Sequence, residues 1–407
     1  MKKLAVVSVV IFIAAGLAFG ETLDCVSCHA VPETLSAAGQ ALGKTLSNEE
    51  VKKLTVNPGG CPTHMNLDCT DCHASIDRFP HPKETHLANP CVACHRDVAD
   101  QMNNSVHKDP LGGTSFVLQC WDCHGAHNIY PQDDPRSPMY PYNVSKVCLT
   151  CHQQRKYLSG VHGQGVDLAG LTGAATCISC HGHHNIRAVK AVGSRTSRRQ
   201  ISFTCGRCHA KIAQEYRKSV HGAALMANDN PDVPTCVDCH QAHQTANPRS
   251  PRFRAESPKL CGKCHADVKL MKKYGLSTQV FQTYVADFHG TTAELFEEVT
   301  PDQPLNQAVC YDCHGYHNVY RVHDVGQEKI NENLLKHCQR CHPAATTKFL
   351  SAWTGHYIPS PTKYPWIYYV RLFYKVAIPS IVGFFLLFIA SDVYRSRRRK
   401  HGGGGAS

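Results

Sequence analysis

Two long apolar runs stand out in the pattern of hydrophobic and polar residues, one near each end of the chain. The first covers residues 4–19, follows Lys2 and Lys3, and ends in a small-x-small sequence. These features predict a secretory signal peptide over residues 1–20. Because the run approaches the length that spans a membrane, a retained amino-terminal anchor is the alternative.

The second run, "VAIPSIVGFFLLFIASDVY", covers residues 376–394 and has no polar face. It predicts a transmembrane helix, with residues 359–394 as linker and helix, rather than a helix lying on the membrane surface. Aromatic residues precede it, and "RSRRRK" with five cations follows. The positive-inside rule therefore predicts an inner-membrane protein whose main domain is periplasmic. Residues 395–407 would be a basic cytoplasmic tail, ending in "GGGGAS", which we expect to be a linker added for expression.

Between the two runs the pattern predicts short helices and irregular loops, with almost no strand signal. In "AKIAQEYRKSV", for example, Ile212, Tyr216 and Val220 recur at i, i+4 and i+8. This spacing predicts one helical face. A helix of this length is unstable alone, so the face must pack against something large and apolar.

Cysteine and histidine dominate the composition, with 23 and 27 of the 407 residues. All cysteines except Cys61 fall into eleven C-x-x-C-H motifs. The motifs are Cys25/Cys28/His29, Cys69/Cys72/His73, Cys91/Cys94/His95, Cys120/Cys123/His124, Cys148/Cys151/His152, Cys177/Cys180/His181, Cys205/Cys208/His209, Cys236/Cys239/His240, Cys261/Cys264/His265, Cys310/Cys313/His314 and Cys338/Cys341/His342. This is the attachment signature of c-type haem. A disulfide framework or an array of zinc sites does not require a histidine after every cysteine pair.

The sequence thus predicts eleven covalently attached c-type haems, each sharing roughly 31 residues of mature chain, too few for a conventional core. We therefore expect a mainly α fold with extensive irregular loops, wrapped around the haems and followed by one C-terminal transmembrane helix. His95, His152, His209 and His265 recur at a nearly constant spacing, so the chain is built from repeats. It forms either one extended haem domain or two halves, residues 21–190 with six motifs and residues 191–358 with five.

A second axial ligand for each iron can be chosen by repeat position among the remaining histidines. The eleven candidates are His64, His86 (or His81), His107, His127, His162, His184 (or His183), His221, His243, His289, His317 and His356. His64 is assigned to the first motif only provisionally, because that motif precedes the regular repeat. Methionine is the competing ligand, with Met65 and Met226 first, and His337 is a substitute. Cys61 has no cysteine left to pair with in the chain, and a buried inert thiol is expected there.

The stretch "CWDCHGAHN" carries a second histidine, His127, three residues after His124. Three residues span about 10 Å at most, and a second ligand must reach the opposite porphyrin face. We therefore expect His127 to serve a different haem, and the same for His184, His243 and His317. Each such loop would then connect two haems.

The net charge of +11 does not predict a nucleic-acid partner. Loss of Lys2 and Lys3 with the signal peptide, and of the five tail cations to the cytoplasm, leaves +4 on the haem region. About two propionates on each haem then make that region acidic.

The repeated "SVHG" and "CHGxHN" sequences resemble the multihaem cytochrome c superfamily, especially the penta- and decahaem electron-conduit cytochromes of anaerobic respiration. The resemblance covers nearly the whole periplasmic part and implies electron transfer along closely spaced haems. The C-terminal anchor differs from quinol-oxidising relatives, whose anchor is amino-terminal. The expected partners are therefore an integral-membrane quinone-reactive or b-type cytochrome subunit and periplasmic or outer-membrane cytochromes.

Two classes of function follow from these observations. An electron-transfer subunit needs only saturated haems, and no catalytic residue is then expected. A multihaem enzyme acting on nitrite, hydroxylamine or sulfite needs one open haem, for which the ligand count leaves no room. A haem filament is disfavoured by the anchor.

Overall fold

The computed structural model describes residues 25–57, 61–76, 89–108, 118–299, 307–320, 327–353, 356, 358–362 and 364–402. The predicted signal peptide, His81 and His86 lie outside these residues. The chain forms two compact units: residues 1–248 with 317–320, and residues 249–316 with 321–407. The predicted division near residue 190 falls inside the first unit.

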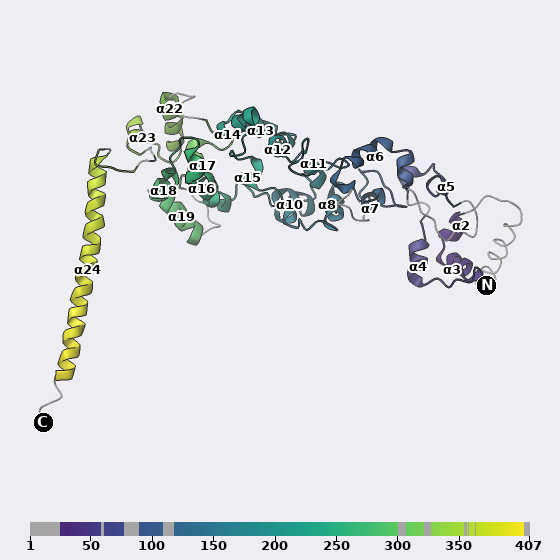
Figure 1. Cartoon of the computed structure of the whole chain (residues 1–407), viewed down its shortest axis with the longest axis horizontal. Helices are drawn as coiled ribbons and strands as arrows, with labels where there is room; N and C mark the ends of the chain where they lie inside the picture. The colour runs from purple at the N-terminus through teal and green to yellow at the C-terminus, as the bar shows by residue number, and fades with distance from the viewer. Residues whose placement is uncertain are drawn as a thin grey trace. The chain divides into compact units, whose positions relative to one another are not determined.

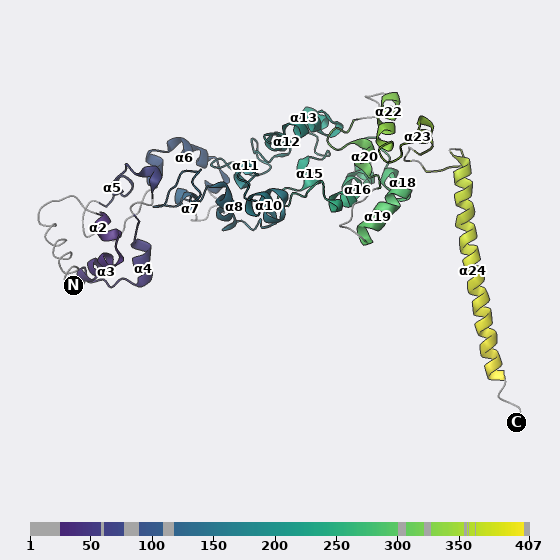
Figure 2. The same cartoon turned by 180° about the vertical axis from the view of Figure 1, so that it is seen from behind.

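Short helices joined by loops make up the first unit (Figures 1 and 2), and the described part of the chain holds no strand. They are α2 (Cys25–His29), α3 (Pro32–Ala41), α4 (Asn48–Leu54), η1 (Pro62–His64), α5 (Cys69–Cys72), η2 (Pro90–Ala93), α6 (Arg96–Asn103), η3 (Val106–Lys108), α7 (Cys120–His124), α8 (Pro141–Leu149), α9 (Lys156–Ser159), α10 (Val161–Asp167), α11 (Cys177–His181), α12 (Arg198–Gly206), α13 (Ala210–Lys218), α14 (Val220–Asn228) and α15 (Cys236–His240). Helix α13 packs against both α12 and α14.

The second unit contains longer helices. They are α16 (Pro251–His265), α17 (Val268–Lys272), α18 (Gln279–Val285), α19 (Phe288–Val299), α20 (Cys310–His314), α22 (Gln327–Cys338), α23 (Thr347–Trp353) and α24 (Pro365–Gly402). Helix α19 packs against α16 and α18. A small apolar cluster of Ala255, Ala293 and Val309 is completed by Tyr311. The helical fold class expected from the sequence is confirmed.

Several C-x-x-C-H motifs are themselves single-turn helices that begin at the first cysteine. In α7, α15 and α20 the residue before the second cysteine is Asp122, Asp238 or Asp312. Its carboxylate accepts a hydrogen bond from the backbone N–H of the residue before the first cysteine, at 2.7, 2.6 and 2.8 Å. This bond satisfies a donor that a helix N-terminus leaves unpaired. The aspartate therefore holds both cysteines on one turn.

The residue after the motif histidine ends these helices with a positive φ. Gly125, Gly182 and Gly315 adopt φ values of 77°, 87° and 78°. In α15 the same position is Gln241, with φ 63° and ψ 162°. This backbone region is favourable only for glycine. Gln241 therefore stores strain that the other three repeats avoid.

The helical face expected in "AKIAQEYRKSV" is only partly correct. Helix α13 ends at Lys218, and Ser219 caps a new helix by accepting from the backbone N–H of Gly222 at 3.2 Å. Tyr216 is buried together with Ala213, whereas Ile212 is 42% exposed. The buried face therefore follows an i, i+3 spacing within α13. The cap at Ser219 prevents one helix from continuing to Val220.

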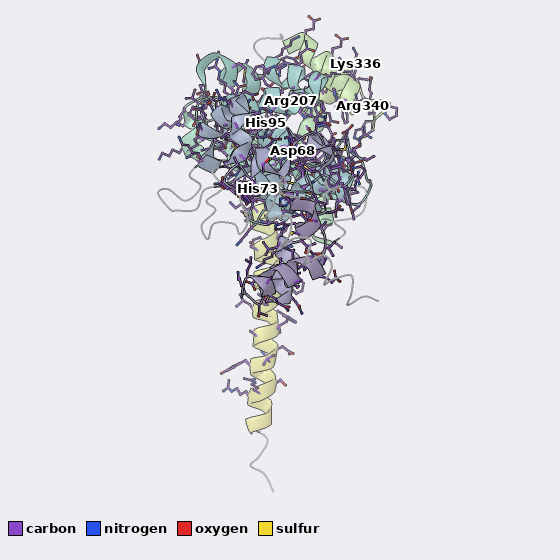
Figure 3. All side chains as sticks on the ribbon, turned by 90° about the vertical axis from the view of Figure 1, so that its right-hand side faces the viewer. Asp68, His73, His95, Arg207, Lys336 and Arg340 are labelled. Atoms are coloured by element: carbon purple, nitrogen blue, oxygen red, sulfur yellow. The ribbon has the colours of Figure 1, made fainter. Side chains whose placement is uncertain are left out.

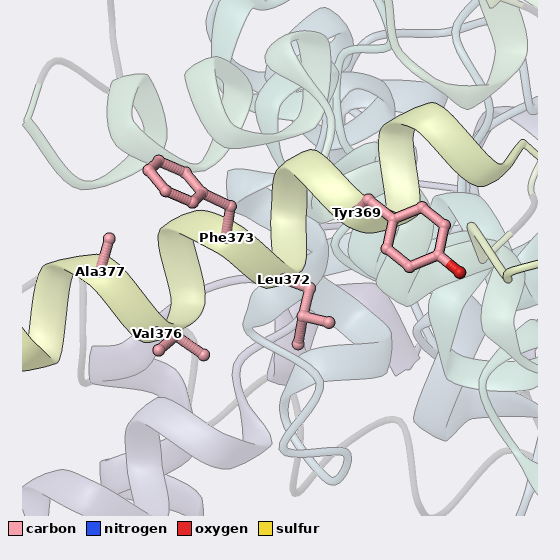
Figure 4. A pocket seen from close by; sticks show the side chains of 5 residues that line it. All are labelled: Tyr369, Leu372, Phe373, Val376 and Ala377. Carbon is pink, nitrogen blue, oxygen red and sulfur yellow. The ribbon is translucent and has the colours of Figure 1, made fainter.

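Helix α24 contains the predicted transmembrane run. Within the described residues, one helix is long and apolar enough to cross a membrane, at Pro365–Arg398. Its mean hydropathy is 2.1, and no residue of its apolar stretch is buried. Side chains such as Tyr369, Phe373 and Val376 project from this helix (Figure 4). Length and composition together make α24 a candidate membrane span.

Candidate haem-binding sites

Nine motif histidines of the described chain each lie beside a second histidine from elsewhere in the sequence. The distance between the two ring centroids falls between 5.8 and 6.4 Å in every pair. The pairs are His73–His127, His124–His184, His181–His243, His240–His317, His314–His356, His64–His95, His107–His152, His162–His209 and His289–His342. Figure 3 labels two of the motif histidines, His73 and His95.

This separation fits an iron atom between two imidazoles. Two metal–nitrogen bonds of about 2.0–2.1 Å and the radii of the two rings add to about 6 Å. A direct hydrogen bond between the rings would bring them closer. No group of three His, Cys, Asp or Glu side chains in the described chain could hold a metal ion by itself. Two axial nitrogens and two neighbouring cysteines are the donor set that a covalently attached haem requires.

The nine pairs fall into two series. In five of them, the first series, a motif histidine lies beside a histidine farther along the chain. His127, His184, His243 and His317 each follow a motif by three residues and lie beside the motif histidine two motifs earlier. His356, which follows the eleventh motif, lies beside the motif histidine of the tenth. None of the five pairs with the motif that it follows. The expected connection of two motifs by one short loop is therefore present.

The four pairs of the second series join a motif histidine to an earlier one. His107, His162 and His289 lie beside the motif histidine of the second motif after them. The two series differ in ring orientation. The ring planes are 13–34° apart in the first series and 44–72° apart in the second.

One provisional assignment from the sequence differs from the structure. His64 was expected beside the first motif, but its ring lies 6.2 Å from His95 of the third. Because His64 stands in η1, before the second motif, it takes the position that His107 and His162 take in later repeats. A second histidine for the first motif therefore stays a prediction, and the candidates His81 and His86 lie outside the described residues.

The other candidates are placed as follows. Between the neighbours His183 and His184, it is His184 that lies beside His124, while His183 is exposed. His221 lies on α14 of the first unit, and His265 ends α16 of the second. Met65 is 79% exposed. Cys61 is partly buried, with its Sγ 3.7 Å from Nδ1 of His64.

A recurring backbone hydrogen bond ties the two series together. The residues before His64, His107, His162 and His221 each donate their N–H to the carbonyl two residues after a first-series histidine. The four bonds are Thr63 to Ile129 at 3.4 Å, Val106 to Ile186 at 2.8 Å, Val161 to Thr245 at 2.9 Å and Val220 to Val319 at 2.7 Å. Each bond therefore fixes one of these four histidines beside one first-series histidine.

Three tyrosines, two of them buried and Tyr284 partly buried, position the next motif. Tyr157, Tyr216 and Tyr284 stand five residues before His162, His221 and His289. Their hydroxyls donate to the carbonyl two residues before the first cysteine of the following motif. The acceptors are Ala175 at 2.8 Å, Pro234 at 2.7 Å and Ala308 at 3.1 Å. Burial raises the pKa of Tyr157 to about 12, so the phenol stays protonated as a donor.

The glycine after each of these three histidines is required by close packing. A Cβ atom at Gly163, Gly222 or Gly290 would lie 2.1, 2.0 or 2.0 Å from the carbonyl oxygen of the preceding tyrosine. The sequence analysis quoted "SVHG" but assigned no role to its glycine or to the tyrosine. The recurring spacing Y-x4-H-G was the signal that could have found both.

First cysteines of consecutive motifs also meet. The thiols of Cys148 and Cys177 contact each other, and the same contact joins Cys205 with Cys236. Cys261 with Cys310 and Cys91 with Cys120 complete the set. These are the first cysteines of the third to tenth motifs, taken in neighbouring pairs. The attachment points of neighbouring motifs are thus adjacent.

The second cysteines of the motifs differ from the first ones in exposure. Seven of them are exposed and four are partly buried in the described chain. The exposed ones are Cys72, Cys94, Cys151, Cys208, Cys239, Cys313 and Cys341, and the partly buried ones are Cys28, Cys123, Cys180 and Cys264.

The thiol contacts described above join first cysteines, so they lend no support to the second cysteine of any motif. For all eleven second cysteines, among them Cys28, Cys94, Cys151, Cys208, Cys239 and Cys264, haem attachment therefore stays a prediction that depends on the motif spacing. An exposed thiol at the edge of a motif helix remains accessible to a haem vinyl group, so this exposure is compatible with the prediction.

Arginines seven residues before the seventh and ninth motifs anchor the eighth and tenth motifs. Arg254 donates to both carboxylate oxygens of Asp312, at 3.1 and 2.7 Å, and to the carbonyl of Gln307 at 2.8 Å. Arg198 forms a longer ion pair with the equivalent Asp238, at 3.7 Å. The aspartates are those that cap the motif helices. The basic segment around Arg198 therefore has a structural role.

Two family models match parts of the chain. The model for cytochrome c3 matches residues 62–153, and the model for a doubled CXXCH motif matches residues 230–270. No curated protein and no solved structure matches the chain. The two matches fall on motifs whose cysteines and paired histidines are described above. With these motifs and these matches, the chain is a multihaem cytochrome c, and its function is electron transfer through covalently bound c-type haems.

Proposed function

We propose that this protein is an undecahaem cytochrome, anchored in the inner membrane by α24, that relays electrons in the periplasm during anaerobic respiration. Its donor or acceptor in the membrane is an integral quinone-reactive or b-type cytochrome subunit. Its other partners are periplasmic or outer-membrane cytochromes. The signal-like amino terminus, the eleven motifs and the basic residues after the apolar window support this assignment.

The pairing of histidines carries the proposal. Nine motif histidines each have a second imidazole at a distance that fits one iron between them. Haem supplies reversible one-electron chemistry when bound. In these nine sites the two histidines would hold both axial positions of a bound haem and would leave no place there for a substrate. Such sites pass electrons without binding nitrite, hydroxylamine or sulfite.

The chain itself contributes three things to electron transfer. The cysteines fix each haem edge, and contacts such as Cys148 with Cys177 keep neighbouring edges together. The backbone bonds of Val106 and Val161 fix the spacing of the histidines. The tyrosine anchors keep each motif in register with the helix before it. A rigid spacing is what rapid transfer between fixed centres needs.

Two measurements on the purified full chain test the proposal. The mass of the intact protein should correspond to eleven haems. Its ferric EPR spectrum should contain low-spin signals and should not change on addition of nitrite, hydroxylamine or sulfite. A high-spin signal that shifts with one of these molecules would contradict the relay and favour an enzyme.

The proposed partners and topology need a separate test. Extraction of the membrane with mild detergent, followed by purification of this chain, should recover an integral-membrane subunit carrying b-type haem or a quinone site. A protease added to intact spheroplasts should digest the haem region and spare the tail of residues 395–407. Digestion of the tail alone would reverse the proposed orientation.

A further inference from the structure

Two neighbouring histidines of the second unit differ in what their free ring nitrogen contacts. The Nδ1 atom of His289 lies 3.5 Å from Oδ2 of Asp287. The Nδ1 atom of His356 lies 3.2 Å from the hydroxyl of Thr283. One imidazole thus faces a full negative charge and the other a neutral hydroxyl. Both are candidate axial ligands, for the last and the tenth motif respectively.

In two other candidate ligands, Nδ1 has no carboxylate beside it among the described residues. The Nδ1 atom of His29 lies 2.8 Å from the backbone carbonyl of Leu54. The Nδ1 atom of His73 is buried and has no hydrogen-bond partner in the described part of the chain. The proposed iron ligands therefore range from an unpartnered nitrogen to one beside a carboxylate.

The partner of Nδ1 controls how strongly the opposite nitrogen donates to a metal. A carboxylate that accepts from Nδ1–H makes the imidazole more basic and stabilises the more highly charged metal ion. For haem the more charged state is ferric iron, so the reduction potential falls. A buried Nδ1 without an acceptor gives the opposite tendency. Because the carboxylate of Asp287 is 38% exposed, water weakens its effect without removing it.

The position of Asp287 is fixed by the fold. It stands between α18 and α19, and its Oδ1 accepts from the backbone N–H of Phe288 at 2.7 Å. The carbonyl of Asp287 accepts from the N–H of Thr291 at 2.9 Å, which closes the first turn of α19. The carboxylate therefore stays beside His289.

We propose that Asp287 is a positioning residue that lowers the reduction potential of the haem held by Cys338 and Cys341. It acts through His289, whose Nδ1 lies beside its carboxylate, and it stabilises the ferric form before one electron is added. The haem of the last motif is thereby a low-potential site of the chain, next in sequence to the membrane helix. This inference rests on the proposed function, because it requires a haem at the eleventh motif.

The test is a potentiometric titration of the full-length holoprotein, followed by low-spin EPR. The component that belongs to the last haem is identified by its absence from a variant with Cys338→Ala and Cys341→Ala. In Asp287→Asn this component should become easier to reduce by about threefold to tenfold, which is about 28 to 59 mV for one electron. Asp287→Glu should restore most of the original value. Glu294→Gln is the matched control, since it removes an exposed carboxylate from α19, the helix that begins directly after Asp287.

The outcomes are distinguishable. A shift in Asp287→Asn, absent from Glu294→Gln and accompanied by an unchanged low-spin spectrum, supports the inference. An unmoved component, or an equal shift in both variants, overturns it and leaves the relay function standing. A chain whose intact mass lacks the haem at Cys338 and Cys341 overturns the inference and the proposed count of eleven together.

Discussion

The ring of His127 lies 5.8 Å from that of His73, with the two planes 20° apart, although His124 is only three residues away in sequence. His127 therefore directly follows the cysteines of the fourth motif but lies beside the histidine of the second motif. The same relationship recurs along the chain. It makes each motif dependent on another that is remote in sequence.

The first prediction separates two adjacent histidines. His184→Met should convert one haem from two histidines to histidine and methionine, because His184 lies beside His124 and methionine is the other common axial ligand. Its potential should rise, and the near-infrared band of methionine-bound ferric haem should appear. His183→Met is the control and should show neither change. In a background with Cys120→Ala and Cys123→Ala, His184→Met should add no such band; a band there would contradict the pairing.

The ring orientations predict two families of low-spin ferric haem. Near-parallel imidazoles, as in the His181–His243 pair at 13°, split the iron orbitals differently from strongly tilted ones, as in His289–His342 at 72°. The EPR spectrum should therefore contain rhombic signals and strongly anisotropic signals in comparable amounts. Spin quantitation checks this. A single family accounting for all haems would contradict the alternation.

A larger side chain after the histidine should destabilise the fold. In Gly222→Ala the new Cβ would lie 2.0 Å from the carbonyl oxygen of Tyr216, so the backbone must move. We expect a loss of about 1–3 kcal/mol in the free energy of unfolding, measured by denaturant titration. Gly173→Ala, where a Cβ meets nothing within 4 Å, should change it by less than about 0.5 kcal/mol. Equal effects would show that the close approach at Gly222 is unimportant.

Replacing Gln241 with glycine should raise the free energy of unfolding instead of lowering it. Its φ of 63° with ψ of 162° suits glycine, which occupies the equivalent position after three other motifs. Gln241→Gly should therefore stabilise the protein by about 1 kcal/mol, after allowing for the entropy that glycine loses on folding. Gln241→Ala keeps the strain and should not stabilise it. Thermal unfolding of both variants compares them directly.

Loss of Arg254 should destabilise the fold far more than loss of the exposed Arg252. Arg254 is 26% exposed and donates hydrogen bonds to Asp312 from two nitrogens. Arg254→Ala therefore leaves a partly buried carboxylate unpaired. We expect a loss of about 1–3 kcal/mol. Arg252, two residues earlier, pairs with Glu256 while 72% exposed. Arg252→Ala should cost less than about 1 kcal/mol, and a larger cost would refute the ranking.

The sequence predicts the local features of this protein well. The motif cysteines, the helical class and the apolar helix α24 depend on spacing and composition, which are visible in the residues themselves. That His127 serves another motif also followed, because three residues cannot reach around a porphyrin. Its partner His73 could not be identified, since nothing local marks a contact with a motif histidine so remote in sequence. The cap at Ser219 was missed because a side-chain cap outweighed the helical period.

The first series of pairs has a consequence for how the protein is made. In each pair the second histidine lies far downstream of the motif histidine, as His317 does from His240 and His356 from His314. If the chain is exported from its amino terminus, each of these irons stays exposed on one side until a later stretch has emerged. Each haem site is then completed in two steps: the motif histidine arrives first, and the second histidine arrives later with a downstream loop. Truncations would consequently leave their defect upstream of the cut, in motifs whose own residues are all present.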